Sequence, residues 1–212
     1  MKNTVELLGF YGGDITHGQS GWTSTVREIT PEKTERLPQF LQQLAIGDGI
    51  NPHSSPFEKS SLHFLVNTDI ATHIHLLKHR IGVSINAESA RYKELKEDKL
   101  YLPDDFPSLW KTELENHTRL SLHLYHQCIK SLVEDYGFAK KRAKESARFF
   151  RTYNTQISAD ILFNFRSFVH FQKLRNSEHA QKEIREIAQQ MLSLIKEIPD
   201  NPFQHSITAF EL

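Results

Sequence analysis

Apolar residues in the amino-terminal part of the chain recur at helical spacing. Leu37, Leu41 and Leu44 are four and three residues apart, which places them on one face of a helix. The earlier pair Thr30-Pro31 is typical of a helix start, because the hydroxyl can cap free N–H groups and proline is tolerated in the first turn. Gly47 is a typical stop. We therefore predict a helix from about Thr30 to Gly47.

The same patterns predict the other elements. Short apolar runs bounded by turn residues indicate strands, whereas longer runs with a period near 3.6 indicate helices. The predicted strands are 5–10, which ends at Gly12-Gly13, and 62–66. The predicted helices are 69–80, 108–136, 158–174 and 177–198. A polar loop is expected after Gly82, and residues 201–212 are expected to form a peripheral tail.

Side chains that bind anions gather between residues 78 and 92. Lys78, His79 and Arg80 are consecutive, and a polar run then ends in Ser89-Ala90-Arg91-Tyr92. Arginine presents a planar fork that fits two phosphate oxygens, lysine adds a point charge and serine adds a short donor. This density of anion-binding groups predicts a site for a phosphorylated ligand.

Composition limits the kinds of protein that this chain can be. Lys and Arg total 26 and Asp and Glu total 26, so zero formal net charge argues against nucleic-acid binding and a polybasic membrane anchor. The only cysteine, Cys128, permits no intramolecular disulfide, and no apolar run reaches the length of a membrane span. We expect a cytoplasmic protein with a local cationic site. The 12 histidines show no HExxH pattern, so no metal site is predicted.

The segment from Lys78 to Tyr92 resembles the signature of the flavin-dependent thymidylate synthases. In that family Arg-His-Arg is followed after seven residues by serine, whereas here Lys-His-Arg is followed after eight residues by Ser89. The run His53–Glu58 is similar to the family's upstream flavin motif. The further matches are Arg148, 164–167, 170–171, 174–175, 179–181 and 183–185. The resemblance covers roughly residues 50 to 190.

This resemblance implies an α+β fold, with a central, mostly antiparallel sheet flanked by long helices and residues 1–212 in a single domain. It also implies bound FAD. The positions that match the family's flavin contacts are His53, Ser55, Glu58, Lys78, His79, Arg80, Ile81, Asn164, Arg166 and His170. Arg166 and His170 are four residues apart, so a helix places both on one face.

The resemblance further implies methylation of dUMP to dTMP, with methylenetetrahydrofolate as carbon donor and NADPH as reductant. The positions that match nucleotide contacts are His75, Glu88, Ser89, Ala90, Arg91, Arg148 and Arg175. The resemblance makes Ser89 and Arg175 the catalytic candidates. Arg175 would stabilise negative charge on the uracil ring. Arg148 would reach the nucleotide of a neighbouring subunit, in a homotetramer whose sites lie between chains. Neither nucleic acid nor a membrane is an expected partner.

Three departures from the family pattern leave alternatives open. Lys78 replaces an arginine, Ala87 stands where a glutamate is usual, and His75 stands where relatives often have glutamine. One alternative is a flavin-dependent methylase or hydroxymethylase that acts on another pyrimidine nucleotide, UMP or dCMP. The other is a non-catalytic protein that binds flavin or nucleotide. A cysteine-dependent mechanism is disfavoured, because Cys128 lies inside the predicted helix 108–136.

Overall fold

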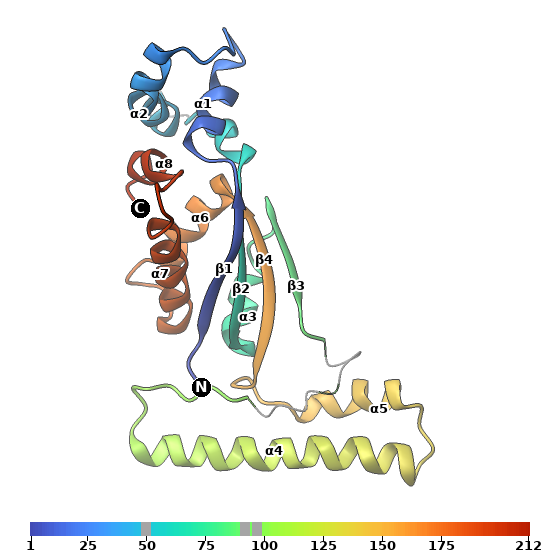
Figure 1. The fold of residues 1–212 in the computed structure, drawn as a ribbon. Helices are drawn as coiled ribbons and strands as arrows, with labels where there is room; N and C mark the ends of the chain where they lie inside the picture. The colour runs from blue at the N-terminus through green and yellow to red at the C-terminus, as the bar shows by residue number, and fades with distance from the viewer. Residues whose placement is uncertain (48–51, 90–93, 95–98) are drawn as a thin grey trace. The chain divides into compact units, whose positions relative to one another are not determined.

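Alternation of buried and less buried residues produces a four-stranded sheet in the computed structural model, which describes residues 1–47, 52–89, 94 and 99–212. On β2, Leu62, Phe64 and Val66 are fully buried at every second position. The strand order is β1-β2-β4-β3, and neighbouring strands are antiparallel (Figure 1). The strands are β1 Thr4–Tyr11, β2 Ser61–Asp69, β3 Val83–Ala87 and β4 Gln156–Asn164.

Helices account for most of the remaining described residues. The α-helices are α1 Asp14–Trp22, α2 Pro31–Ile46, α3 Ile70–Leu76, α4 Ser108–Glu134, α5 Lys140–Ala147, α6 Phe165–Arg175, α7 Lys182–Lys196 and α8 Gln204–Ala209. Two short 3-10 helices are η1 Ser55–Lys59 and η2 Arg148–Phe150. The predicted α+β class with a central antiparallel sheet is therefore confirmed.

The chain divides into two compact units. The first unit comprises Met1–Thr4, Asn67–His75 and Asn86–Ala159. The second unit comprises Val5–Val66, Leu76–Ile85 and Asp160–Leu212. That residues 1–212 form a single domain stays a prediction.

Aromatic side chains form the core of the second unit. Phe64 of β2 stacks on Phe168 of α6 with ring centroids 6.1 Å apart, and Phe163 of β4 meets the same ring edge-on at 6.0 Å. On α7, a stripe of fully buried residues packs toward α6; its members are Ile184, Ile187, Ala188, Met191 and Ile195. Burial of these apolar faces fixes α6, which carries several of the predicted site residues.

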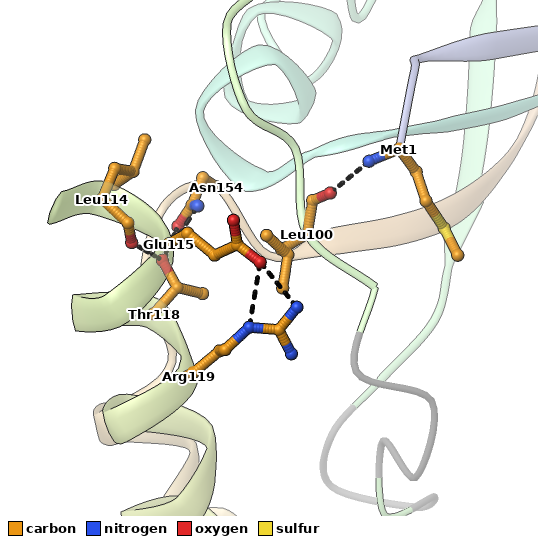
Figure 2. Close-up of polar contacts among 7 residues, drawn as sticks. All are labelled: Met1, Leu100, Leu114, Glu115, Thr118, Arg119 and Asn154. Carbon is orange, nitrogen blue, oxygen red and sulfur yellow. Dashed lines mark hydrogen bonds and ion pairs between the residues drawn. The ribbon is translucent and has the colours of Figure 1, made fainter. Parts of the chain in front are cut away.

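In the first unit, polar contacts tie α4 to the segment before β4. Thr118 donates a hydrogen bond to the Leu114 carbonyl at 2.7 Å, and the Asn154 amide donates to the Thr118 hydroxyl at 2.9 Å (Figure 2). The amino group of Met1 donates to the Leu100 carbonyl at 2.6 Å. Apolar packing adds to these bonds, since Tyr125 and other buried α4 residues contact α5.

The predicted helix 158–174 is wrong in its first half. Residues up to Asn164 form strand β4, and helix α6 begins only at Phe165. Ala159, Ile161 and Phe163 are buried at every second position, which is the period of a strand. This alternation was present in the sequence, but helical spacing further along the segment obscured it.

Other boundaries also differ from the predictions. Helix α3 ends at Leu76 rather than near residue 80, so the residues from Lys78 to Arg80 lie in the connection that follows it. The expected polar loop after Gly82 is strand β3. Helix α7 begins at Lys182 rather than at 177. For α3 the apolar spacing continued to Leu77, one residue past the end of the helix, whereas the mostly polar residues 177–181 carry no apolar period that would extend α7 toward its start.

The expected peripheral tail is a further error, because residues 201–212 are packed into the second unit. Phe203 is fully buried, and its ring stacks on Phe165 at a centroid distance of 5.4 Å. Ile207 and Phe210 are also buried. The segment therefore contributes apolar surface to the core beside the start of α6.

Several predicted elements are confirmed. Helix α2 starts after Thr30, whose hydroxyl accepts a hydrogen bond from the Lys33 N–H at 3.3 Å, and it ends at Gly47, which has a φ of 65°. The strands predicted at 5–10 and 62–66 are also present, and so is the long helix predicted from Ser108, whose N-cap residue is Pro107. None of the described helices combines the length and apolar character of a membrane crossing.

The buried tail leads to a prediction about stability. Phe203→Ala should lower the free energy of unfolding by about 3–5 kcal/mol, because the substitution removes a fully buried ring and leaves a cavity. Urea unfolding followed by circular dichroism measures this change. Ile46→Ala, at a side chain that is 53% exposed, is the control and should change the free energy by less than about 1 kcal/mol. Equal values for the two variants would contradict the packing described above.

Candidate active site

The first turn of α6 is organised by Asn164. Its side-chain oxygen accepts a hydrogen bond from the Ser167 N–H at 2.8 Å, which satisfies one of the free donors at the helix start. Phe165 and Phe168 are fully buried on the inner face of the helix. Arg166 on the same turn is therefore directed away from the core and is exposed.

The segment after α3 is held against this helix start by two hydrogen bonds. The Asn164 N–H donates to the Gly82 carbonyl at 2.8 Å, and the Ser167 hydroxyl donates to the Ile81 carbonyl at 2.6 Å. Gly82 has a φ of 64°, and a Cβ at this position would lie 2.2 Å from the Asn164 amide nitrogen and 2.4 Å from the Ser167 hydroxyl. Only glycine fits this close approach.

His79 is buried at the base of the same region and is 8% exposed. The Arg175 guanidinium donates from Nε to His79 Nε2 at 3.0 Å. Because arginine can only donate, His79 Nε2 is an acceptor and the ring proton is assigned to Nδ1. Burial, then the charge of Arg175 and the nearby His170, lower the pKa of His79 from 6.5 to about 4. The imidazole is therefore neutral at pH 7.

These residues surround a cleft of about 700 Å³, which we call the cationic cleft. Its lining residues are Glu58, Lys78, His79, Arg80, Ile81, Gly82, Val83, Asn164, Arg166, Ser167, His170, Leu174 and Arg175. Arg166 Nη1 and Glu58 Oε1 form an ion pair at 2.6 Å. The lining contains four cationic side chains and a single carboxylate, so its charge is positive with neutral histidines.

The cationic cleft can hold an anionic ligand that also has an apolar part. Its cations suit phosphate oxygens, whereas Ile81 and Leu174, which are 90% and 49% exposed, offer apolar surface to a flat ring. These two properties together suit a ligand that carries both phosphate and an aromatic ring. The described residues contain no group of three or more His, Cys, Asp or Glu side chains that could hold a metal ion.

Most of the positions predicted to contact flavin meet at this cleft. Eight of the ten line it, namely Glu58, Lys78, His79, Arg80, Ile81, Asn164, Arg166 and His170. His53 and Ser55 are exposed and are not among the lining residues. Arg175, predicted for the nucleotide, also lines the cleft. The cleft is also lined by four residues that were not predicted to contact a ligand, namely Gly82, Val83, Ser167 and Leu174. The position of Ser167 three residues after Asn164 is the spacing of a helix cap, which was the available signal.

The positions predicted for the nucleotide fall mostly in the first unit. His75 lies in α3, and Arg148 begins η2. Glu88 and Ser158 form a reciprocal contact, in which the Glu88 N–H donates to the Ser158 carbonyl and the Ser158 N–H donates to the Glu88 carboxylate, both at 2.9 Å. Ser89 follows directly and is half-buried. Ala90 and Arg91 lie outside the described residues, and the nucleotide roles of all these positions stay predictions.

Comparison with known proteins gives consistent matches over most of the chain. A family model described as thymidylate synthase complementing protein matches residues 13–199. The chain is 30% identical over 207 residues to a flavin-dependent thymidylate synthase from Thermosipho melanesiensis, covering 92% of this chain and 86% of that relative. It is 27% identical over 180 residues to a probable flavin-dependent thymidylate synthase from Mycobacterium phage D29, covering 82% and 74% of the respective chains.

A solved structure also resembles this chain. It is a UMP/dUMP methylase, PolB, from Streptomyces cacaoi, bound with 5-Br dUMP. The two structures align with a TM-score of 0.77 and 25% sequence identity, covering 99% of this chain and 95% of that chain. Together with the cationic cleft, these matches confirm the predicted family and enzyme class. The chain belongs to the flavin-dependent thymidylate synthase family, a family of flavoprotein methyltransferases.

Proposed function

We propose that the protein methylates dUMP to dTMP, with FAD as cofactor, methylenetetrahydrofolate as carbon donor and NADPH as reductant. The observation that carries this proposal is the cationic cleft, where eight predicted flavin positions from η1, the connection after α3 and α6 converge. The names of the relatives support the same reaction. Bound flavin would supply the hydride transfer, and the protein would supply binding, orientation and electrostatics.

The charges of the cleft support FAD as the flavin. Lys78, Arg80 and Arg166 are exposed cations on its wall, and a diphosphate is the part of FAD that such groups bind. The side-chain oxygen of Asn164 accepts a hydrogen bond from the Ser167 N–H. The NH₂ group of the same amide is a donor that can face a ligand. His53 and Ser55, which precede the cleft residue Glu58 by a few positions, are included in the proposed FAD site on the resemblance alone.

Arg175 has the strongest structural case for contact with the pyrimidine. Its Nε is engaged by His79, which fixes one edge of the guanidinium and leaves the terminal nitrogens for a ligand. A fixed guanidinium beside the uracil carbonyls would stabilise negative charge that develops on the ring. We propose that neutral His79 orients Arg175 and that Arg175 performs this electrostatic role.

The nucleotide phosphate would be held by Ser89 and Arg91, with Arg148 supplied by another subunit. His75, Glu88 and Ala90 complete the proposed nucleotide site. This arrangement requires a homotetramer with sites between chains, which we propose on the basis of the family resemblance. Serine and arginine donors suit a phosphomonoester, since both donate to phosphate oxygens and arginine can do so bidentately.

Methylation of UMP is the second candidate function. The similar solved structure is named a UMP/dUMP methylase, so this fold is found in a protein named for both nucleotides. The departures at Lys78 and Ala87 also leave UMP and dCMP as alternative substrates and a hydroxymethyl nucleotide as an alternative product. A flavin- or nucleotide-binding protein without synthase activity is the remaining alternative, and turnover itself separates it from the others.

The proposed reaction can be tested directly. We expect the purified protein to be yellow, to be bleached by NADPH and to convert dUMP with methylenetetrahydrofolate to dTMP, as measured by mass analysis of the nucleotide. UMP and dCMP are parallel substrates, and a product 14 mass units heavier indicates methylation. Turnover confined to UMP or dCMP would overturn the choice of dUMP. Flavin that NADPH reduces but that nucleotide and folate never reoxidise would indicate binding without synthesis.

The close approach at Gly82 gives a matched pair of variants. Gly82→Ala and Gly137→Ala both place a side chain at a positive φ, 64° and 68°, so each carries a similar backbone cost of about 1 kcal/mol. Only the new Cβ at Gly82 collides with Asn164 and Ser167, whereas nothing lies within 4 Å at Gly137. We expect Gly82→Ala to weaken FAD binding by about tenfold or more and Gly137→Ala to leave it unchanged. Fluorescence titration with FAD measures both, and equal affinities would contradict the assignment.

The depressed pKa of His79 predicts a pH dependence of stability. Between about pH 4 and 6.5 the unfolded chain binds a proton on this ring that the folded chain does not bind. The contribution of His79 to the free energy of unfolding therefore decreases as the pH falls from 6.5 toward 4, by up to about 1.4 kcal/mol per pH unit. In His79→Gln this slope should be reduced by up to the same amount. Urea unfolding between pH 5 and 7 measures it, with Ile46→Ala, which removes no titratable group, as the control that keeps the wild-type slope.

A further inference from the structure

A buried chain of hydrogen bonds crosses the second unit outside the cationic cleft. Its members are Asp14, Ser206, His17 and Ser60, each at most 5% exposed. Ser206 Oγ donates to Asp14 Oδ1 at 2.5 Å, His17 Nδ1 lies 2.8 Å from Ser206 Oγ, and His17 Nε2 lies 2.6 Å from Ser60 Oγ. None of these residues has a role in the proposed chemistry.

The protons along this chain can be assigned from one end. Since the Ser206 hydroxyl donates to Asp14, its oxygen must accept from His17, which places the ring proton on Nδ1. His17 Nε2 then accepts from the Ser60 hydroxyl. Burial lowers the pKa of His17 to about 3, which keeps the ring neutral and this single tautomer in place. Every member of the chain therefore has a partner, the condition under which a buried polar network specifies one arrangement.

The two ends of the chain belong to different parts of the second unit. Asp14 accepts the backbone N–H groups of His205 and Ser206 at 2.8 and 2.9 Å, so this end is anchored on α8. Ser60 directly follows η1, and its carbonyl accepts the N–H of Phe165 at 3.3 Å. Phe165 is the first residue of α6. His17 thus connects α8 to both elements that carry the Glu58–Arg166 ion pair.

The His17 ring also packs against the residues beside that ion pair. Its centroid lies 5.0 Å from the ring of Phe57 and 5.2 Å from the ring of Phe165. Phe57 precedes Glu58 on η1, and Phe165 precedes Arg166 on α6. Glu58 and Arg166 are therefore each preceded by a phenylalanine that contacts the buried ring of His17. These contacts fix the backbone on which each charged residue lies.

We propose that His17 is a positioning residue of the cationic cleft. Its neutral ring holds Ser60 and the two adjoining phenylalanines, and through them it sets the separation of Glu58 and Arg166 at the wall of the cleft. Without these hydrogen bonds the pair would sample a wider range of positions and the cleft would bind flavin more weakly. This inference rests on the proposed flavin site.

His17→Phe tests the proposal, because phenylalanine keeps the ring volume but can neither donate nor accept. Ser206→Ala removes the middle hydroxyl and serves as the milder second variant. We expect both to raise the dissociation constant of FAD, His17→Phe by about tenfold. His17→Gln, whose amide offers a donor and an acceptor, should recover part of the affinity. Fluorescence titration of the apoprotein with FAD supplies the constants.

Two further measurements separate positioning from a general loss of stability. Leu41→Ala removes a fully buried α2 side chain that does not line the cleft, so it should destabilise the fold while leaving FAD affinity within about twofold. In a Glu58→Gln background the ion pair is already lost. If His17 acts through that pair, His17→Phe should then have a smaller effect on FAD affinity than it has in the wild-type chain.

The outcomes distinguish this inference from the proposed function. A wild-type protein that binds no flavin overturns both. A wild-type protein that binds FAD, with His17→Phe and Ser206→Ala no weaker than Leu41→Ala, overturns the positioning role alone. An undiminished effect of His17→Phe in the Glu58→Gln background overturns the route through the ion pair. Weaker binding by both variants, partial recovery by His17→Gln and the reduced effect in that background support the proposal.

Discussion

The close contact between Gly82 and the first turn of α6 is the constraint on which the cationic cleft depends. Asn164 donates its N–H to the Gly82 carbonyl while its side chain caps α6, so one residue fixes both the helix start and the segment opposite. The absence of a Cβ at Gly82 allows the two backbones to approach. Because Lys78 and Arg80 precede this contact and Arg166 follows it, the contact brings cations from distant parts of the sequence to one cleft.

Such a concentration of positive charge is costly in a folded chain unless partners or geometry offset it. Two devices do so here. Glu58 pairs with Arg166, and His79 stays neutral by burial, so it accepts a hydrogen bond from Arg175 rather than adding another charge. The cleft is thus organised before any ligand arrives, which lowers the cost of binding an anion.

The departures from the family signature leave this arrangement intact. Lys78 lines the cleft and keeps a positive charge there, although it lacks the bidentate fork of an arginine. The extra residue lies between Arg80 and Asn86, in the segment that includes β3. Glu88 follows directly after β3, and its carboxylate accepts a hydrogen bond from the N–H of Ser158 on β4. The family's glutamate thus has a nearby counterpart in Glu88, whose carboxylate already accepts a backbone hydrogen bond.

Local pattern alone determined a large part of this protein. Short-range signals placed helix α2 from its cap to Gly47, and the spacing of Arg166 and His170 put both on one face of a helix, because such features depend only on neighbours in sequence. Only the tertiary structure decided that residues 156–164 form a strand, that the tail containing Phe203 is core, and that His17 bridges Ser206 of α8 and Ser60. These outcomes depend on contacts between residues far apart in the chain, and burial against such partners outweighs local helical preference.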